Sequence, residues 1–370
     1  MQGKQLPKRM ISVDILKISA MLMVVFLHAT SSNYGLKDIS VSWGSLQYLF
    51  VVALRMFSMC AVNCFVLISG YFYSAKNIKY TKLITLWLQV EFYSVGIYLL
   101  LCIVPNSGVT FNIKALIYCL LPLLTGRYWF FTDYFLLMLI SPMLNTFMNK
   151  LGKSEFRNYL IVLLTVFSLI PTLNIFGDTF GTENGFSLLW FAVLYLLEGY
   201  LRNYPPKAKY YRKKYVGICL IMCVVFISAD YLKQYISVFG AVSNLLSTYN
   251  HVLVLLSAVM LFCAAIRSPS EHQGNFSKII SKCAGMSFGV YLLHEHPQIR
   301  SFLWQELVNL QSVAHAPVRL GVQIIVTAVL VFLAAITIEL IRMVIFQLVG
   351  KVFKNTPLII KLQNIQTRRD

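Results

Sequence analysis

The chain has 370 residues, of which 58% are hydrophobic and only 12% are charged. Soluble domains carry about a quarter of charged residues, so this composition excludes an ordinary soluble protein and predicts a polytopic helical membrane protein. The net charge of +18 would suit a nucleic-acid-binding protein. The Lys and Arg residues, however, stand in short clusters between long apolar runs, as the positive-inside rule expects. We therefore expect a lipid bilayer around the protein and no nucleic-acid partner.

The first apolar run, over residues 12–31, contains three ionisable residues that a simple membrane anchor would lack: Asp14, Lys17 and His28. Lys17 and His28 are separated by about three helical turns and about 16 Å of rise, so they face nearly the same side, with Asp14 one turn before Lys17. Ionisable groups at membrane depth normally face protein or water, so this polar stripe is predicted to line the functional site. In the alternative interpretation, Lys17 reaches the membrane surface beside Asp14 and His28 only packs.

The distribution of Lys and Arg supports an all-α bundle of about ten crossings, with both termini in the cytoplasm. Segments placed inside hold 23 of the 32 basic residues and segments placed outside hold six, while Lys17, Arg55 and Arg342 fall within crossings. The run 113–124 is too short to span, so we expect it to be re-entrant or interfacial. The expected crossings are residues 12–31, 46–73, 83–104, 128–148, 158–176, 186–201, 215–232, 248–266, 284–300 and 320–347.

The chain is expected to form one membrane domain over residues 1–350, followed by a basic cytoplasmic tail over 351–370. We see no internal repeat and no soluble domain, so the site must be built from the helices. The eight cysteines form no C-x-x-C pair and lie mostly in apolar runs. They are therefore interpreted as reduced packing residues.

Two stretches in the first half of the chain offer candidate binding residues. Lys79 and Lys82, three positions apart at the inner start of a helix, share a face that could hold phosphates, although positive-inside topology also explains them. Asn63 in the second crossing, and Trp129 and Asp133 at the outer start of the fourth, are candidate substrate-binding residues. Trp129 would equally suit an interfacial aromatic belt, and Asp133 could simply be solvated.

A third stretch lies in the ninth crossing. Ser287, Tyr291 and His294 follow an i, i+4, i+7 pattern and so form one stripe of a helix. His294, Glu295 and His296 are adjacent in sequence, which raises the question of a metal site. Adjacent residues on a helix point in different directions, and no other acidic or His pair has ligand spacing, so we expect no metal.

Together, in this order and spacing, these stretches resemble the acyltransferase 3 family of integral membrane acyltransferases over nearly the whole chain. The family's basic residue and His, ten residues apart, are matched by Lys17 and His28, with Asp14 also matching. The chain departs from the family in carrying Lys where Arg is common, which keeps the charge but loses bidentate geometry. It also carries no fused hydrolase-like domain from which an acceptor type could be inferred. The other matching positions are Phe65 to Tyr71, Lys79 and Lys82, Trp129, Phe130, Ser141, Pro142, Leu144, Asn145, and Ser287 to His294.

The resemblance implies O-acyl transfer, most often of acetyl, from cytoplasmic acyl-CoA to a hydroxyl of an extracytoplasmic or lipid-linked polysaccharide sugar. It also implies a multi-pass protein of the bacterial plasma membrane. A sugar hydroxyl needs a positioned base near neutral pH, and His has a suitable pKa. His28 is therefore expected to act as general base, or alternatively as a transient acyl carrier.

The remaining candidates take supporting roles in this interpretation. Lys17 would neutralise CoA phosphate or hold the thioester end, with Asp14 orienting it, and Lys79 and Lys82 would bind CoA phosphates at the inner mouth. The opposite wall would supply donors to the tetrahedral oxyanion from Ser287, Tyr291 and His294.

The helices are then expected to enclose a polar passage. Lys17 would lie near its inner mouth, while His28 and His294 would converge further out, with His294 near the middle of the membrane. Two other functions are compatible with the same sequence. One is a carrier or flippase for polysaccharide or lipid-linked sugar, and the other is an acyltransferase acting on peptidoglycan or a small molecule.

Overall fold

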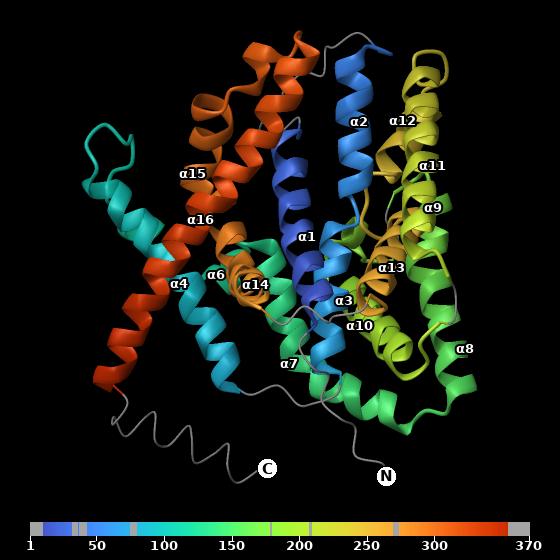
Figure 1. The fold of residues 1–370 in the computed structure, drawn as a ribbon, viewed down its shortest axis with the longest axis horizontal. Coiled ribbons are helices and arrows are strands. Elements are labelled where there is room, and N and C mark those ends of the chain that lie inside the picture. Colours follow the sequence, from blue (N-terminus) through green and yellow to red (C-terminus); the bar gives the residue numbers. More distant parts are fainter. Residues whose placement is uncertain are drawn as a thin grey trace.

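The computed structural model describes residues 10–31, 36, 43–74, 80–177, 180–206, 209–268 and 274–353. Lys79 and nearly all of the expected tail lie outside this part of the chain. The described residues form helices and no strand, which confirms the all-α class (Figure 1). The elements are α1 (Ile11–Ala29), α2 (Leu46–Ser58), α3 (Ala61–Tyr73), α4 (Tyr80–Ile103), α5 (Ile113–Leu120), α6 (Pro122–Thr125), α7 (Trp129–Lys150), α8 (Lys153–Leu164), η1 (Thr165–Leu169), α9 (Ile170–Leu173), η2 (Glu183–Gly185), α10 (Leu188–Asn203), α11 (Tyr211–Leu232), α12 (Val238–Leu245), α13 (Val252–Ile266), α14 (Asn275–His294), α15 (Pro297–Ser301), η3 (Phe302–Leu307), η4 (Leu310–Val313) and α16 (Pro317–Phe353).

Among the described residues, seven helical stretches are long and apolar enough to span a membrane. The other three expected crossings correspond to α10, α13 and α14, of which α13 is an apolar helix of 15 residues. The multi-pass architecture is therefore present, and the full count of ten stays a prediction. The seven stretches are Ile11–Ala29, Leu46–Tyr73, Thr81–Ile103, Trp129–Lys150, Lys153–Leu173, Tyr211–Leu232 and Pro317–Val349.

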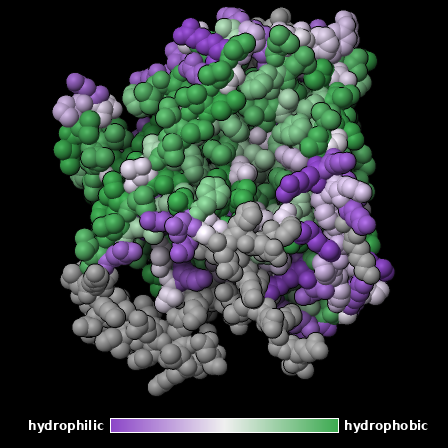
Figure 2. All heavy atoms as spheres, viewed as in Figure 1, coloured by the Kyte–Doolittle hydropathy of each residue, from purple (hydrophilic) through white to green (hydrophobic). Residues whose placement is uncertain are grey.

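The surface of the bundle has an apolar central band. Figure 2 shows hydrophobic residues over the centre of one face, with hydrophilic residues gathered above and below them. α1 begins and α16 ends at the same side of the bundle (Figure 1). The cytoplasmic assignment of that side stays a prediction.

The expected non-spanning segment is built from two short helices. α5 has eight residues, which is about 12 Å of rise against a hydrocarbon core of about 30 Å. Pro122 opens α6, whose four residues end at Gly126 in a left-handed conformation. The chain then turns directly into α7, so this segment places Trp129 at the start of a spanning helix.

The packing of α1 against α14 positions the candidate site. Ser281 donates a hydrogen bond to Asp14 at one end of this pair, and His28 contacts His294 at the other. The sequence offset is nearly the same at both ends, so the two helices run parallel and in register. The two helices therefore bring the signatures at the two ends of the sequence side by side.

The predicted ninth crossing over residues 284–300 was wrong in its bounds. α14 begins nine residues earlier, at Asn275, and ends at His294 before Pro297. Its first turns contain Lys278 and Lys282. Because these residues are charged, the apolar run begins after the true start of the helix. His294 is thus the last residue of a 20-residue helix and does not lie near its middle.

A buried polar cluster joins α4, α14 and α16. The Glu339 carboxylate accepts two hydrogen bonds from Arg342, at 2.9 and 2.7 Å, and one each from Gln89 and Tyr93, at 2.9 and 2.8 Å. A Cβ added at Gly289 would lie 2.7 Å from Oε2 of Glu339 and 2.9 Å from the Tyr93 hydroxyl. Glycine at this position therefore lets the carboxylate approach the α14 backbone.

Candidate active site

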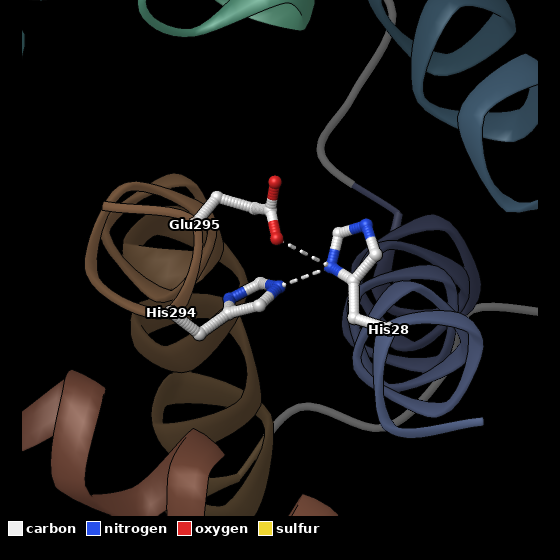
Figure 3. A group of neighbouring side chains, drawn as sticks. All are labelled: His28, His294 and Glu295. Carbon is white, nitrogen blue, oxygen red and sulfur yellow. Dashed lines mark hydrogen bonds and ion pairs between the residues drawn. The ribbon is translucent and has the colours of Figure 1, made fainter. Parts of the chain in front are cut away.

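The centre of the site is a contact between two histidines from opposite ends of the sequence. Nδ1 of His28 lies 2.9 Å from Nε2 of His294 (Figure 3). His28 is the penultimate residue of α1, and His294 ends α14 and is completely buried. The parallel packing of these helices brings the two rings together at the C-terminal ends of both helices.

Hydrogen bonding assigns the tautomers of both rings. Nδ1 of His294 lies 2.5 Å from the Val290 carbonyl oxygen, which can only accept, so this nitrogen carries a proton. In a neutral His294 the other nitrogen, Nε2, is then an acceptor, and Nδ1 of His28 must be the donor to it. This leaves Nε2 of His28 as the basic atom of that ring, on the side away from His294 (Figure 3).

Glu295 completes the cluster. Its Oε1 lies 3.2 Å from Nδ1 of His28, and its Oε2 lies 3.5 Å from the Arg300 guanidinium, from which it accepts a hydrogen bond. The Glu295 side chain is only 8% exposed, so its charge is little screened by water. A carboxylate at this position stabilises a protonated His28 ring and fixes its orientation.

Glu295 was not predicted as a site residue, because the adjacent residues His294 and Glu295 would point apart on a continuous helix. The helix ends at His294, however, and Glu295 is a C-cap with non-helical backbone angles. Both side chains can therefore turn towards His28. The signal that was available is Pro297, which commonly follows a helix end by one or two residues.

A cavity of about 220 Å³ lies beside this cluster and connects it with Lys17. Lys17 and His28 both line it, separated by about 16 Å of rise along α1. One cavity therefore reaches both ends of the polar stripe, and the expected polar passage across the membrane stays a prediction. Its other lining residues come from α1, α3, α4, α7, α14 and the segment before α13: Met21, Val24, Val62, Phe65, Ser69, Leu86, Gln89, Trp129, Phe130, Tyr134, Tyr249, Gly285, Phe288 and Tyr291.

The structure brings two more predicted residues to the cavity. Trp129 stacks on Tyr249 with ring centroids 5.9 Å apart and an interplanar angle of 16°. Tyr291, one turn before His294, forms part of the opposite wall. Trp129 therefore belongs to an aromatic lining of the cavity and not only to an interfacial belt.

Six predicted residues that the structure describes do not line the cavity: Asn63, Ser287, Asp133, His294, Asp14 and Lys82. The Asn63 amide is completely buried and satisfied by protein, donating to the Tyr249 carbonyl and accepting from the Trp190 indole. Ser287 is also completely buried and donates to the Cys283 carbonyl within its own helix. Asp133 lines a separate surface depression together with Glu183.

The predicted donor-side residues lie near the beginnings of their helices. Asp14, in the first turn of α1, accepts a hydrogen bond of 2.6 Å from Ser281. Lys82 is exposed in the first turn of α4, with its ammonium 5.6 Å from the centroid of the Tyr73 ring. Leu86 and Gln89 follow Lys82 at i+4 and i+7, and both line the cavity. One face of α4 therefore leads from Lys82 to the cavity wall.

A family model described as an acyltransferase domain, of the acyltransferase 3 type, matches residues 10–341, which is nearly the whole chain. The chain belongs to the acyltransferase 3 family. No curated protein and no solved structure matches it.

Not every residue of the acyltransferase 3 signatures lies at the site. The fourth-crossing residue Asn145 donates to the Tyr73 carbonyl and accepts from the Tyr195 hydroxyl, so it ties α3, α7 and α10 together. Gly70 admits the buried Glu198 side chain, whose Oε2 would lie 3.0 Å from an added Cβ. These motif positions build the scaffold, whereas Lys17, His28, Trp129 and Tyr291 line the cavity and His294 contacts His28.

Proposed function

We propose that this protein transfers an acyl group, most simply acetyl, from cytoplasmic acyl-CoA to a hydroxyl of an extracytoplasmic or lipid-linked polysaccharide sugar. Membership of the acyltransferase 3 family supports acyl transfer. The single observation that carries the proposal is the shared cavity, because Lys17 and His28 line one space at different depths. A donor that enters beside Lys17 could therefore extend along the cavity to His28. The acceptor would approach His28 from the opposite end of the cavity.

In the proposed reaction His28 acts as general base. The acceptor O–H bond breaks as its proton passes to Nε2 of His28, and the oxygen bonds to the thioester carbonyl carbon. The carbon–sulfur bond then breaks, and the proton passes from His28 to sulfur, leaving an ester and free CoA. While His28 is protonated, the Glu295 carboxylate 3.2 Å from its Nδ1 offsets the positive charge.

The donor would bind from the end of the cavity that Lys17 lines. Lys17 offers a positive charge to phosphate or to the thioester end, and Lys82 offers another at the inner start of α4. Gln89 donates its amide N–H to Glu339, which fixes the orientation of its side chain at the cavity wall. The amide carbonyl of Gln89 is thus an acceptor suited to an N–H group of the donor. Tyr291, on the opposite wall, is the candidate donor to the oxyanion.

The test is transfer of radiolabelled acetyl from acetyl-CoA to envelope material, with CoA release measured in parallel. Membranes from source cells that lack the native gene and express the wild-type chain should incorporate label and release CoA. His28→Ala should lower the rate at least about 100-fold, the lower end of what a general base contributes. His315→Ala is the matched control, since His315 is exposed and does not line the cavity.

A carrier would give neither label incorporation nor CoA release with the wild-type chain, and that result would overturn the proposal. Transfer by His28→Ala at a rate near wild type would instead remove His28 from the mechanism. The melting temperature of each purified variant shows that a loss of rate does not come from unfolding.

A further inference from the structure

The cluster at the outer end of α1 and α14 has the geometry of a metal site. One ligand atom each from His28, His294 and Glu295 lies within 4.8 Å of the others. Two of the separations are 2.9 and 3.2 Å. A tetrahedral zinc ion with bonds of about 2.0–2.1 Å holds its ligand atoms about 3.3 to 3.4 Å apart. Only a few tenths of an ångström therefore separate the two closest pairs from zinc-binding distances.

We propose that His28, His294 and Glu295 bind a divalent transition-metal ion of the zinc class, and that this ion inhibits the enzyme reversibly. Two imidazoles and one carboxylate suit zinc better than magnesium or calcium, which prefer oxygen ligands. Three protein ligands leave a fourth position for water, as in open zinc sites. The binding claim stands on the geometry alone, whereas the inhibition claim also rests on the proposed function.

The hydrogen-bond partners of the ligand side chains favour metal binding, because they orient the ligand atoms. Metal-ligating histidines usually donate their second ring N–H to an acceptor that fixes the tautomer. His294 already does so, because its Nδ1 donates to the Val290 carbonyl and its Nε2 lone pair points at His28. The second oxygen of Glu295 is held by Arg300 at 3.5 Å, which leaves Oε1 on the side of the two histidines. Two of the three ligands are thus oriented without any rearrangement.

Inhibition follows from the tautomer of His28. Without metal, its proton sits on Nδ1 and its lone pair sits on Nε2, the atom proposed to accept the substrate proton. A neutral imidazole that binds metal through Nδ1 must carry its single proton on Nε2. The ion would therefore convert the basic atom into a hydrogen-bond donor, without net release of a proton from the ring. The nearby Arg300 guanidinium disfavours a dication, so we expect weaker binding than at four-ligand structural sites.

The binding test is titration of the purified, chelator-treated protein in detergent with cobalt chloride, a spectroscopic substitute for zinc. We expect about one equivalent of cobalt with the visible absorption of a tetrahedral site, displaced by zinc chloride. The absorption should lack a sulfur-to-cobalt charge-transfer band, which would reveal binding by the eight free cysteines instead. His294→Ala and Glu295→Gln should each abolish the signal, and His315→Ala should keep it.

A signal that survives in both His294→Ala and Glu295→Gln, or no signal in the wild type, would overturn the metal site. Inhibition is measured separately as loss of CoA release with zinc chloride and its recovery with chelator. Full activity at a zinc concentration that saturates the cobalt-competent site would overturn the inhibition claim. If cobalt binds as expected but no acyl transfer occurs in metal-free protein, the proposed function fails while the metal site stands.

Discussion

His28 gains its proposed role from groups that the substrate does not touch. The Val290 carbonyl fixes the proton on His294, His294 in turn fixes the proton on His28, and Glu295 lies beside the same nitrogen. These contacts place the basic nitrogen of the partly buried His28 ring on the side away from His294. A histidine that served only as packing would not require two oriented polar neighbours.

Glu295 tests that argument at a single residue. Glu295→Gln keeps the size of the side chain but removes its charge, and hydrogen bonds to charged groups are worth about 1.5–3 kcal/mol. We expect kcat to fall about 10- to 100-fold while KM for acetyl-CoA stays near its wild-type value. Steady-state CoA release measures both constants. A rise in KM with unchanged kcat would place Glu295 in donor binding and not in base stabilisation.

Substitutions at Lys17 can distinguish a role of its charge from a role in packing. Lys17→Ala should be severe because it removes the only Lys or Arg charge among the residues lining the described cavity. Lys17→Arg should be largely tolerated, since the family commonly carries Arg there and the charge is retained. The measurement is the rate against acyl-CoA concentration for both variants. Equal damage by Arg and Ala would show that ammonium shape or space matters, and not charge.

At the scale of helices, α14 depends on a close approach that only glycine permits. Gly289→Ala would place a methyl group against the Glu339 carboxylate and the Tyr93 hydroxyl. Overpacking of this kind typically costs about 1–3 kcal/mol, so we expect a lower melting temperature in detergent. Gly285→Ala in the same helix is the control, because nothing lies within 4 Å of its added methyl. Equal melting temperatures of the two variants would contradict the packing account.

The face of α4 that starts at Lys82 carries a separate prediction. Lys82→Ala should raise KM for acyl-CoA more than it lowers kcat, because a phosphate contact remote from the thioester contributes mostly uniform binding. The effect should weaken as salt rises, since Lys82 is exposed. The double variant with Lys79→Ala should enlarge it. An unchanged KM in both would leave these lysines as topology signals only.

The sequence predicted some elements well and others poorly, for identifiable reasons. The stripe from Lys17 to His28 followed from helical periodicity, which a 19-residue apolar helix obeys closely. The start of α14 could not be predicted from the sequence, because Lys278 and Lys282 lie inside the helix and a charged stretch of this kind is typical of a loop. The contact of Glu295 with His28 was not predicted, because the backbone of Glu295 leaves the helix. The burial of Asn63 was not predicted either, because its partners, Trp190 and the Tyr249 carbonyl, are remote in sequence.

For the whole molecule, the central claim is that donor and acceptor meet in one cavity from opposite sides of the membrane. Both ends of the sequence contribute to that arrangement, since α1 and α14 run parallel with Asp14 and Ser281 at one end and His28 and His294 at the other. The family match covers both helices. With Lys17 at the cytoplasmic end of the cavity, as the predicted topology has it, an acceptor confined to the cytoplasm would have to pass Lys17 to approach His28.

The most direct measurement is the sidedness of transfer in sealed vesicles, because acetyl-CoA does not cross membranes. Inside-out vesicles of source cells expose the cytoplasmic face, and radiolabelled acetyl-CoA added to them should label envelope sugar in the lumen. Right-side-out vesicles should give no label until they are permeabilised, and His28→Ala should give none in either. Labelling of intact right-side-out vesicles, or labelled product only on the outer surface of inside-out vesicles, would contradict a reaction that joins the two sides of the membrane.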